Sequence, residues 1–156
     1  MAQALLDASV TILETTPSGA PHSQFLTSGR PAIDCEFVGV QVARLAEDAT
    51  SPLSVLDTKR RNHFGNIIMA TYIIYVVRCG PSIKSGLPPT DNSKTENASM
   101  VFKDGWVLWN GIRDMQDDLF DGCLGVYFDG GVPIEEQGGY VGWVFQIRAS
   151  IEGYSP

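Results

Sequence analysis

Residues 92–122 read NSKTENASMVFKDGWVLWNGIRDMQDDLFDG, and the rest of the chain is best understood as strands and loops arranged against this stretch. Ser93 and Glu96 have the spacing of a capping box, which satisfies free amides at the start of a helix. Apolar or small residues then recur every three or four positions: Ala98, Val101, Gly105, Leu108, Ile112, Met115 and Leu119. Asp121-Gly122 is typical of a helix end. The pattern predicts one long amphipathic helix over residues 93–121.

Three large aromatic residues lie off the centre of this apolar stripe and widen it. They are Phe102, Trp106 and Trp109. We expect them to need apolar cover from a second surface, such as another subunit, and they are the leading interface candidates. The polar residues of the stretch fall largely on its other sides: Lys103, Asp104, Asn110, Arg113, Asp114 and Asp117.

Acidic residues crowd the end of the predicted helix. These are Asp114, Asp117, Asp118 and Asp121. The helix dipole disfavours negative charge at a C-terminus, so this arrangement has a local cost and indicates a role outside the monomer. Glu135 and Glu136 form a second acidic cluster in a predicted loop. Both clusters are candidates for contacts outside the subunit, and a merely solvated acidic surface is the alternative.

Composition limits the classes of protein. The chain has 156 residues, 44% of them hydrophobic, which suits one domain with one core, residues 1–156. Its formal charge is −7, which disfavours binding to nucleic-acid phosphates because such binding needs clustered Lys and Arg. No stretch approaches the roughly 18 apolar residues of a membrane span, and the N-terminus lacks the features of a signal peptide. We expect a soluble protein made in the cytosol.

The remaining pattern predicts further elements in chain order. A short helix is expected over residues 2–14, with Leu5, Leu6, Ser9, Ile12 and Leu13 on its apolar face. Strands are expected over residues 25–28, 33–45, 66–78, 123–128 and 142–151, with a loop at 129–133. The strand at 142–151 alternates between a buried face and a wetter face, the wetter one carrying Val144, Gln146, Arg148 and Ser150. The strand at 66–78 is apolar on both faces, so we expect a central strand covered on both sides, with a buried helix as the alternative. The prediction is an α+β fold: a mixed or antiparallel sheet of about four strands with two helices packed on one face.

No catalytic or metal-binding constellation emerges. His22 and His63 are not spaced with other ligands, and a calcium-loop reading of residues 117–122 fails because Leu119 stands where an oxygen ligand is needed. Gly130-Gly131 and Gly138-Gly139 are expected in turns or loops. We therefore expect no enzymatic activity, no cofactor and no bound metal.

The three cysteines, Cys35, Cys79 and Cys123, follow no metal motif and are expected to be small buried hydrophobes. A disulfide between Cys35 and Cys79 remains open if their strands pair. The basic residues Lys59, Arg60 and Arg61 are expected in a solvated loop. The alternative is that this loop binds an acidic partner.

Three short motifs carry a resemblance to a known family. GRPAIDCE (residues 29–36) leads into a valine-rich strand, VVRCGP (76–81) ends the next, and DGW (104–106) lies in the long helix. This combination resembles small neck-region proteins of long-tailed, siphovirus-like phages of actinobacteria, which are usually read as tail terminators. The resemblance covers residues 29–151. The expected order of helix, strands, helix and strands is also similar to the lambda-type tail terminator fold. The polar segment 59–63 does not match the family pattern.

The resemblance implies a structural virion protein of the neck and tail. It implies a ring of six copies that caps the tail tube protein, joins the head-tail connector or stopper protein, and lets genomic DNA pass without specific binding. In such a ring we expect at least one of the two acidic clusters to face the DNA channel or a basic patch on the adjacent ring. The alternatives are another neck protein, such as a stopper or connector, and a small ligand-binding domain. An acidic lumen would suit DNA passage because it repels phosphate, and a charge of −7 is compatible with that role.

Overall fold

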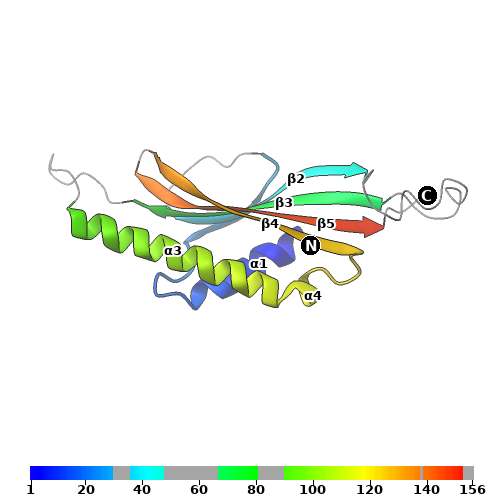
Figure 1. The fold of residues 1–156 in the computed structure, drawn as a ribbon, viewed down its shortest axis with the longest axis horizontal. Coiled ribbons are helices and arrows are strands. Elements are labelled where there is room, and N and C mark those ends of the chain that lie inside the picture. Colours follow the sequence, from blue (N-terminus) through cyan, green and yellow to red (C-terminus); the bar gives the residue numbers. More distant parts are fainter. Residues whose placement is uncertain (30–35, 48–66, 81–89, 138, 153–156) are drawn as a thin grey trace, which may run out of the picture.

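The computed structural model describes residues 1–29, 36–47, 67–80, 90–137 and 139–152 (Figure 1). The helices in this part of the chain are α1 (Ala2–Glu14), α3 (Asp91–Asp114) and α4 (Gln116–Leu119). The strands are β1 (Ser23–Thr27), β2 (Phe37–Glu47), β3 (Ile67–Cys79), β4 (Gly125–Gln137) and β5 (Tyr140–Glu152). The fold is α+β, as predicted.

The five strands form one mixed sheet in the order β1-β2-β3-β5-β4. Strand β1 runs parallel to β2, and the other neighbouring pairs are antiparallel. The expectation of a sheet of about four strands agrees with this, and the fifth is the short edge strand β1, close to the strand expected at residues 25–28. The central place of β3 is as predicted.

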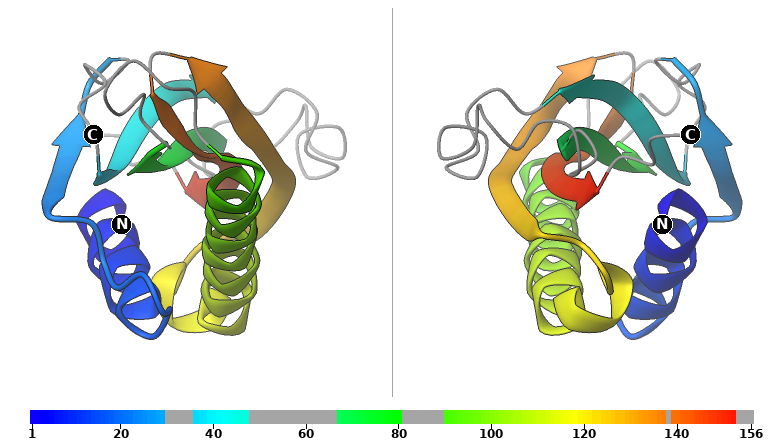
Figure 2. Two further views of the ribbon diagram at one scale, coloured as in Figure 1. Left: turned by 90° about the vertical axis from the view of Figure 1, so that its left-hand side faces the viewer. Right: turned by 90° about the vertical axis from the view of Figure 1, so that its right-hand side faces the viewer.

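Both long helices lie on the same face of the sheet (Figure 2). The α1 residues of the predicted apolar face, Leu5, Leu6, Ser9, Ile12 and Leu13, are all buried. Helix α1 approaches α3 closely at Gly111, where a Cβ atom would lie 2.8 Å from Ile12 Cδ1. A side chain at position 111 would displace Ile12, so the glycine lets the two helices pack closely, and the helices and the sheet enclose one core.

Strand β3 is not covered on both sides by helices, contrary to the sequence-based expectation. Its residues alternate: Ala70, Tyr72, Ile74 and Val76 are buried against the helices. Residues 71, 73 and 75 point to the opposite face and stay partly exposed. Tyr75 adapts to that face because its hydroxyl donates a hydrogen bond to Gln41 Oε1 at 2.9 Å. An apolar strand sequence therefore did not require a second helical layer.

Helix α3 begins and ends differently from the prediction. Thr90, not Ser93, is the N-cap: its Oγ1 accepts from the Ser93 amide at 3.3 Å, so the capping box was wrong. The predicted helix 93–121 is broken at Met115, whose φ of −96° and ψ of 9° leave the helical region. The short α4 follows, and the buried Phe120 then reaches the core. Gly122, with φ of +75°, turns the chain afterwards.

Strand β4 is longer than predicted. The segment 129–133, expected as a loop, continues the strand through a bulge between Phe128 and Gly130, where Gly130 adopts a φ of +115°. A bulge needs a residue that tolerates this conformation, and the glycine pair provides it without ending the strand. The turn expected at Gly138-Gly139 is confirmed for Gly139, whose φ is +87°.

Strand β5 has the predicted buried face, with Phe145, Ile147 and Ala149 in the core. Ser150 is an exception to the predicted wetter face, since only 5% of it is exposed.

Candidate functional site: an aromatic groove beside helix α3

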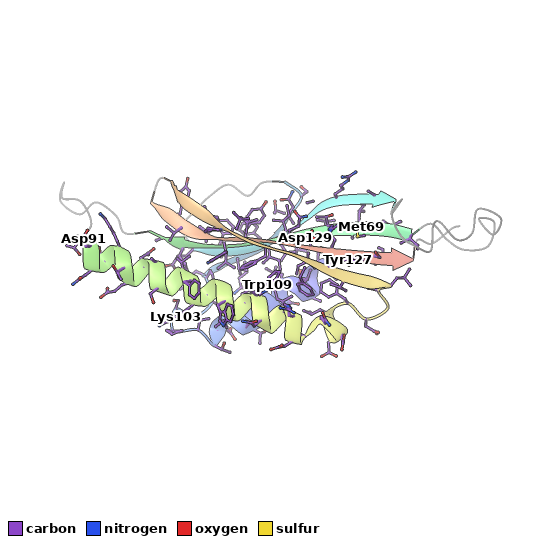
Figure 3. All side chains as sticks on the ribbon, in the orientation of Figure 1. Met69, Asp91, Lys103, Trp109, Tyr127 and Asp129 are labelled. Atoms are coloured by element: carbon purple, nitrogen blue, oxygen red, sulfur yellow. The ribbon has the colours of Figure 1, made fainter. Side chains whose placement is uncertain are left out.

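An open groove of about 240 Å³ lies between α3 and strands β4 and β5. Its lining residues are Phe102, Gly105, Trp106, Trp109, Gly130, Gly131, Trp143 and Phe145. The chain has three tryptophans, and all three line this groove. We call it the aromatic groove. Figure 3 shows Trp109 on α3 on the side where that helix faces the sheet.

The floor of the aromatic groove is a stack of rings. Trp143 stacks on Phe145 with centroids 5.7 Å apart, and Phe145 stacks on Trp109 at 5.6 Å. Phe128 meets Trp109 edge-on at 5.5 Å. Trp143 Nε1 donates a hydrogen bond of 2.9 Å to the carbonyl oxygen of Val101. These contacts tie β5 and β4 to α3, so the floor is held in one geometry.

Two glycines make room for the floor. A Cβ atom at Gly105 would lie 2.4 Å from Trp143 Nε1, and one at Gly131 would lie 2.4 Å from Phe145 Cε1. Both distances are far below a normal contact. The glycine of α3 and the glycine of β4 therefore let the aromatic rings lie directly on the backbone.

The rim of the aromatic groove is exposed. Phe102 and Trp106 are four residues apart on α3, so they lie on one side of the helix, and each is 60% exposed. Trp109 differs, because it packs against the core. The three aromatic residues that were grouped as interface candidates therefore fall into two classes. Trp109 packs against the core of its own subunit, whereas the side chains of Phe102 and Trp106 are mostly exposed to solvent. Their role as interface residues stays a prediction.

The side chains of the aromatic groove suit the binding of an apolar partner better than catalysis. The indole nitrogen of Trp143 already donates to Val101, and the other lining side chains named above carry no ionisable group. Within the described residues, no group of His, Cys, Asp and Glu could hold a metal ion. The groove can bury apolar surface, but it offers no general acid, base or nucleophile.

The acidic candidates lie in different places. Asp114, Asp117, Asp118 and Asp121 are exposed around the end of α3 and α4, so they form one surface cluster, which we call the acidic end. Glu135 and Glu136 belong to strand β4 rather than to a loop, and their side chains lie outside the described part of the structure. Lys59, Arg60, Arg61 and Cys35 also lie outside it.

Sequence reasoning missed a buried ion pair. It placed Asp104 on the polar side of the helix, but Asp104 is 1% exposed and its Oδ2 accepts from Arg78 Nε at 2.8 Å. Arg78, 3% exposed, also donates to the carbonyl oxygen of Gly19, so the pair joins β3, α3 and the segment after α1. A signal was present: Asp104 lies three residues after Val101 and four before Leu108, which is the spacing of the buried stripe.

A second group of polar side chains, which the sequence analysis also did not predict, lies on the surface and holds the bulge of β4 in place. Asp129 accepts from Arg148 Nε at 2.7 Å and Nη2 at 2.6 Å, and from Gln146 Nε2 at 2.8 Å. The hydrogen bonds from Arg148 hold the pKa of Asp129 below its usual value. Arg148 also lies over the ring of Tyr127, 5.5 Å from its centroid; Figure 3 labels Tyr127 and Asp129. Every donor here comes from a side chain of β5, so these bonds join the two strands at the bulge.

The expectation of small buried cysteines is wrong for Cys79, which is exposed at the end of β3, and holds in part for Cys123. It packs against the core, and burial raises the pKa of its thiol. It therefore stays protonated at neutral pH.

Comparisons with protein-family models and with curated proteins found no match to this chain. Among the described residues, no helix is long and apolar enough to cross a membrane.

Proposed function

We propose that this chain is a tail terminator of a long-tailed phage. Copies of it would form a ring, of six in the family that it resembles, that caps the tail tube and joins it to the head-tail connector around the DNA channel. It would be made in the host cytoplasm and act in the virion, without catalysis, cofactor or membrane. The α+β fold with helices on one face supports this proposal, since it agrees with the architecture that the resemblance implies.

One observation carries the proposal: Phe102 and Trp106 are each 60% exposed beside an aromatic groove. A contiguous apolar patch on a soluble subunit usually marks a contact with another protein. Aromatic residues are also enriched in the buried centres of protein interfaces. A subunit that works only within an assembly would expose such a patch when alone, as this one does.

A small-ligand site fits less well. Pockets for small molecules usually measure about 300–1,000 Å³ and contain a few convergent polar groups that orient the ligand. The aromatic groove is about 240 Å³ and open, its lining side chains carry no charged group, and the indole donor of Trp143 is already used. A protein surface therefore suits the groove better than a metabolite.

The acidic end gives the proposal a second, separate part. We place Asp114, Asp117 and Asp118 at the DNA channel, where negative charge prevents phosphate from sticking during passage. Their joint change to lysine should leave particles normal but impair DNA release. Unjoined tails would instead indicate docking to a neighbouring ring, and normal behaviour in both assays would remove the cluster from the mechanism. Reversal of the exposed Asp7 and Glu14 on α1 is the matched control.

The proposal is tested by adding the purified chain to uncapped tail tubes and imaging them by negative stain. We expect a ring at one end of each tube, and tails that then join to filled heads. A protein that instead binds only the isolated head vertex would be a connector or stopper. Absence of binding to either structure would contradict a role in the neck.

A further inference from the structure

The chain carries a second exposed apolar patch, far from the aromatic groove. Leu26, Val42 and Leu45 are between 40% and 64% exposed, and we call them the β1–β2 patch. Val42 pairs with Tyr72 and Leu45 with Ala70, both of which are buried against the helices. Side chains paired across a sheet point to the same face, so the patch lies on the helix-bearing face, beyond the cover that α1 gives to Val38 and Val40.

The two patches occupy opposite corners of that face. The groove residues Trp143 and Phe145 pair with Val76 and Ile74 of β3. Val42 and Leu45 lie on the other side of β3, opposite Tyr72 and Ala70, which is two to six residues farther along that strand. Leu26 lies still farther across the sheet, on the edge strand β1. Three strand spacings separate β2 from β4, which is about 14 Å, and the offset along the strands adds roughly 7–20 Å for Val42 and Leu45. The patches therefore cannot cover each other within one subunit.

The edge strand β4 is poorly suited to pairing with a strand of a neighbour. Its pairing with β5 is irregular at residues 128–130 and again at 134–137, and Pro133 between them has no amide to donate. Bulges and proline are common devices that blunt a sheet edge. A partner at this edge must be held by side chains, and the aromatic groove supplies them.

We infer that the aromatic groove of one subunit receives the β1–β2 patch of a second copy of this chain. The inference rests on the proposed ring. The contact joins two different surfaces, so each subunit uses its groove on one side and its patch on the other. Such a contact closes into a ring when the rotation between neighbours divides a full turn. The exposed parts of Phe102, Trp106, Leu26, Val42 and Leu45 amount to roughly 500 Å² of apolar surface. The smallest stable interfaces bury about 1,200 Å² in total, of which a little over half is apolar, so these side chains supply most of what is needed.

Two complementary variants test this pairing. Trp106→Glu disables the groove and Leu45→Glu disables the patch, and both positions are at least 60% exposed, so the subunit should still fold. The control is Val132→Glu, which is 67% exposed but pairs with Val144, on the face of the sheet away from the helices. Circular dichroism and thermal melting confirm folding, and analytical ultracentrifugation measures mass.

Wild type and Val132→Glu should assemble into rings, and each of the other two variants alone should stay monomeric. Mixed in equal amounts, Trp106→Glu and Leu45→Glu retain one intact groove and one intact patch between them, so the mixture should give dimers and nothing larger. Rings formed by Leu45→Glu alone would overturn the inference and leave the proposed function standing, since the groove would then receive another surface. A wild type that forms no ring, alone or on tail tubes, would contradict both.

Discussion

Gly105→Ala is the most informative single substitution in the subunit. In an ordinary helix it should stabilise, because alanine is favoured over glycine by about 1 kcal/mol. Here the new Cβ would lie 2.4 Å from Nε1, 2.6 Å from Cε2 and 2.7 Å from Cδ1 of Trp143. The indole must move by the better part of an ångström, which strains its stack on Phe145 and its hydrogen bond to Val101.

The costs exceed the gain. Overpacking of this kind costs about 1–3 kcal/mol, and loss of the hydrogen bond adds about 1 kcal/mol. We expect a net loss near 2 kcal/mol in the free energy of unfolding, or about 4–8 °C in Tm for a chain of this size. Urea denaturation measures the change in the free energy of unfolding, and tryptophan emission reports the displacement of Trp143. The control is Ser99→Ala, a substitution at an exposed position of the same helix. A variant that gains stability and keeps the wild-type emission would show that Trp143 does not rest on α3.

Three other predictions concern the subunit. Trp109→Ala should lower the free energy of unfolding by about 3 kcal/mol, since the ring packs against the core; equilibrium denaturation measures it. Asp104→Asn should cost about 3–5 kcal/mol by leaving the buried charge of Arg78 unpaired, and the double change Arg78→Met, Asp104→Leu should recover part of this loss. Hydrogen bonds from Arg148 lower the pKa of Asp129, so the ionised Asp129 stabilises the fold above about pH 4, and this contribution is lost as the pH falls further. In thermal melts from about pH 5 to 2.5, the Tm of Asp129→Asn should therefore fall less steeply than that of the wild type.

Regular apolar patterns made much of the fold predictable. The helix at residues 2–14 was placed at its observed bounds, because its apolar face, buried through Leu5 to Leu13, follows the helical repeat. Strand β5 was clear because Phe145, Ile147 and Ala149 alternate with more polar residues. In both elements burial on one face alone determined the pattern.

The errors arose where a tertiary contact overruled a local rule. Asp104 has the type of a surface residue, and only its partner Arg78, 26 positions earlier in the chain, makes burial possible. Gly131 has the type of a loop residue, but it lies in a strand because the ring of Phe145 occupies the space of a side chain. The aromatic groove combines both kinds of contact, so its residues could be suspected from the sequence while its shape could not.

The measurement that tests the central claim most directly is a cryo-electron microscopy map of the capped end of the tail tube, at a resolution that places α3. We predict a closed ring of copies of this chain, with Trp106 enclosed by the neighbouring subunit. A tube end without this chain, or a ring in which Trp106 faces solvent, would contradict the account.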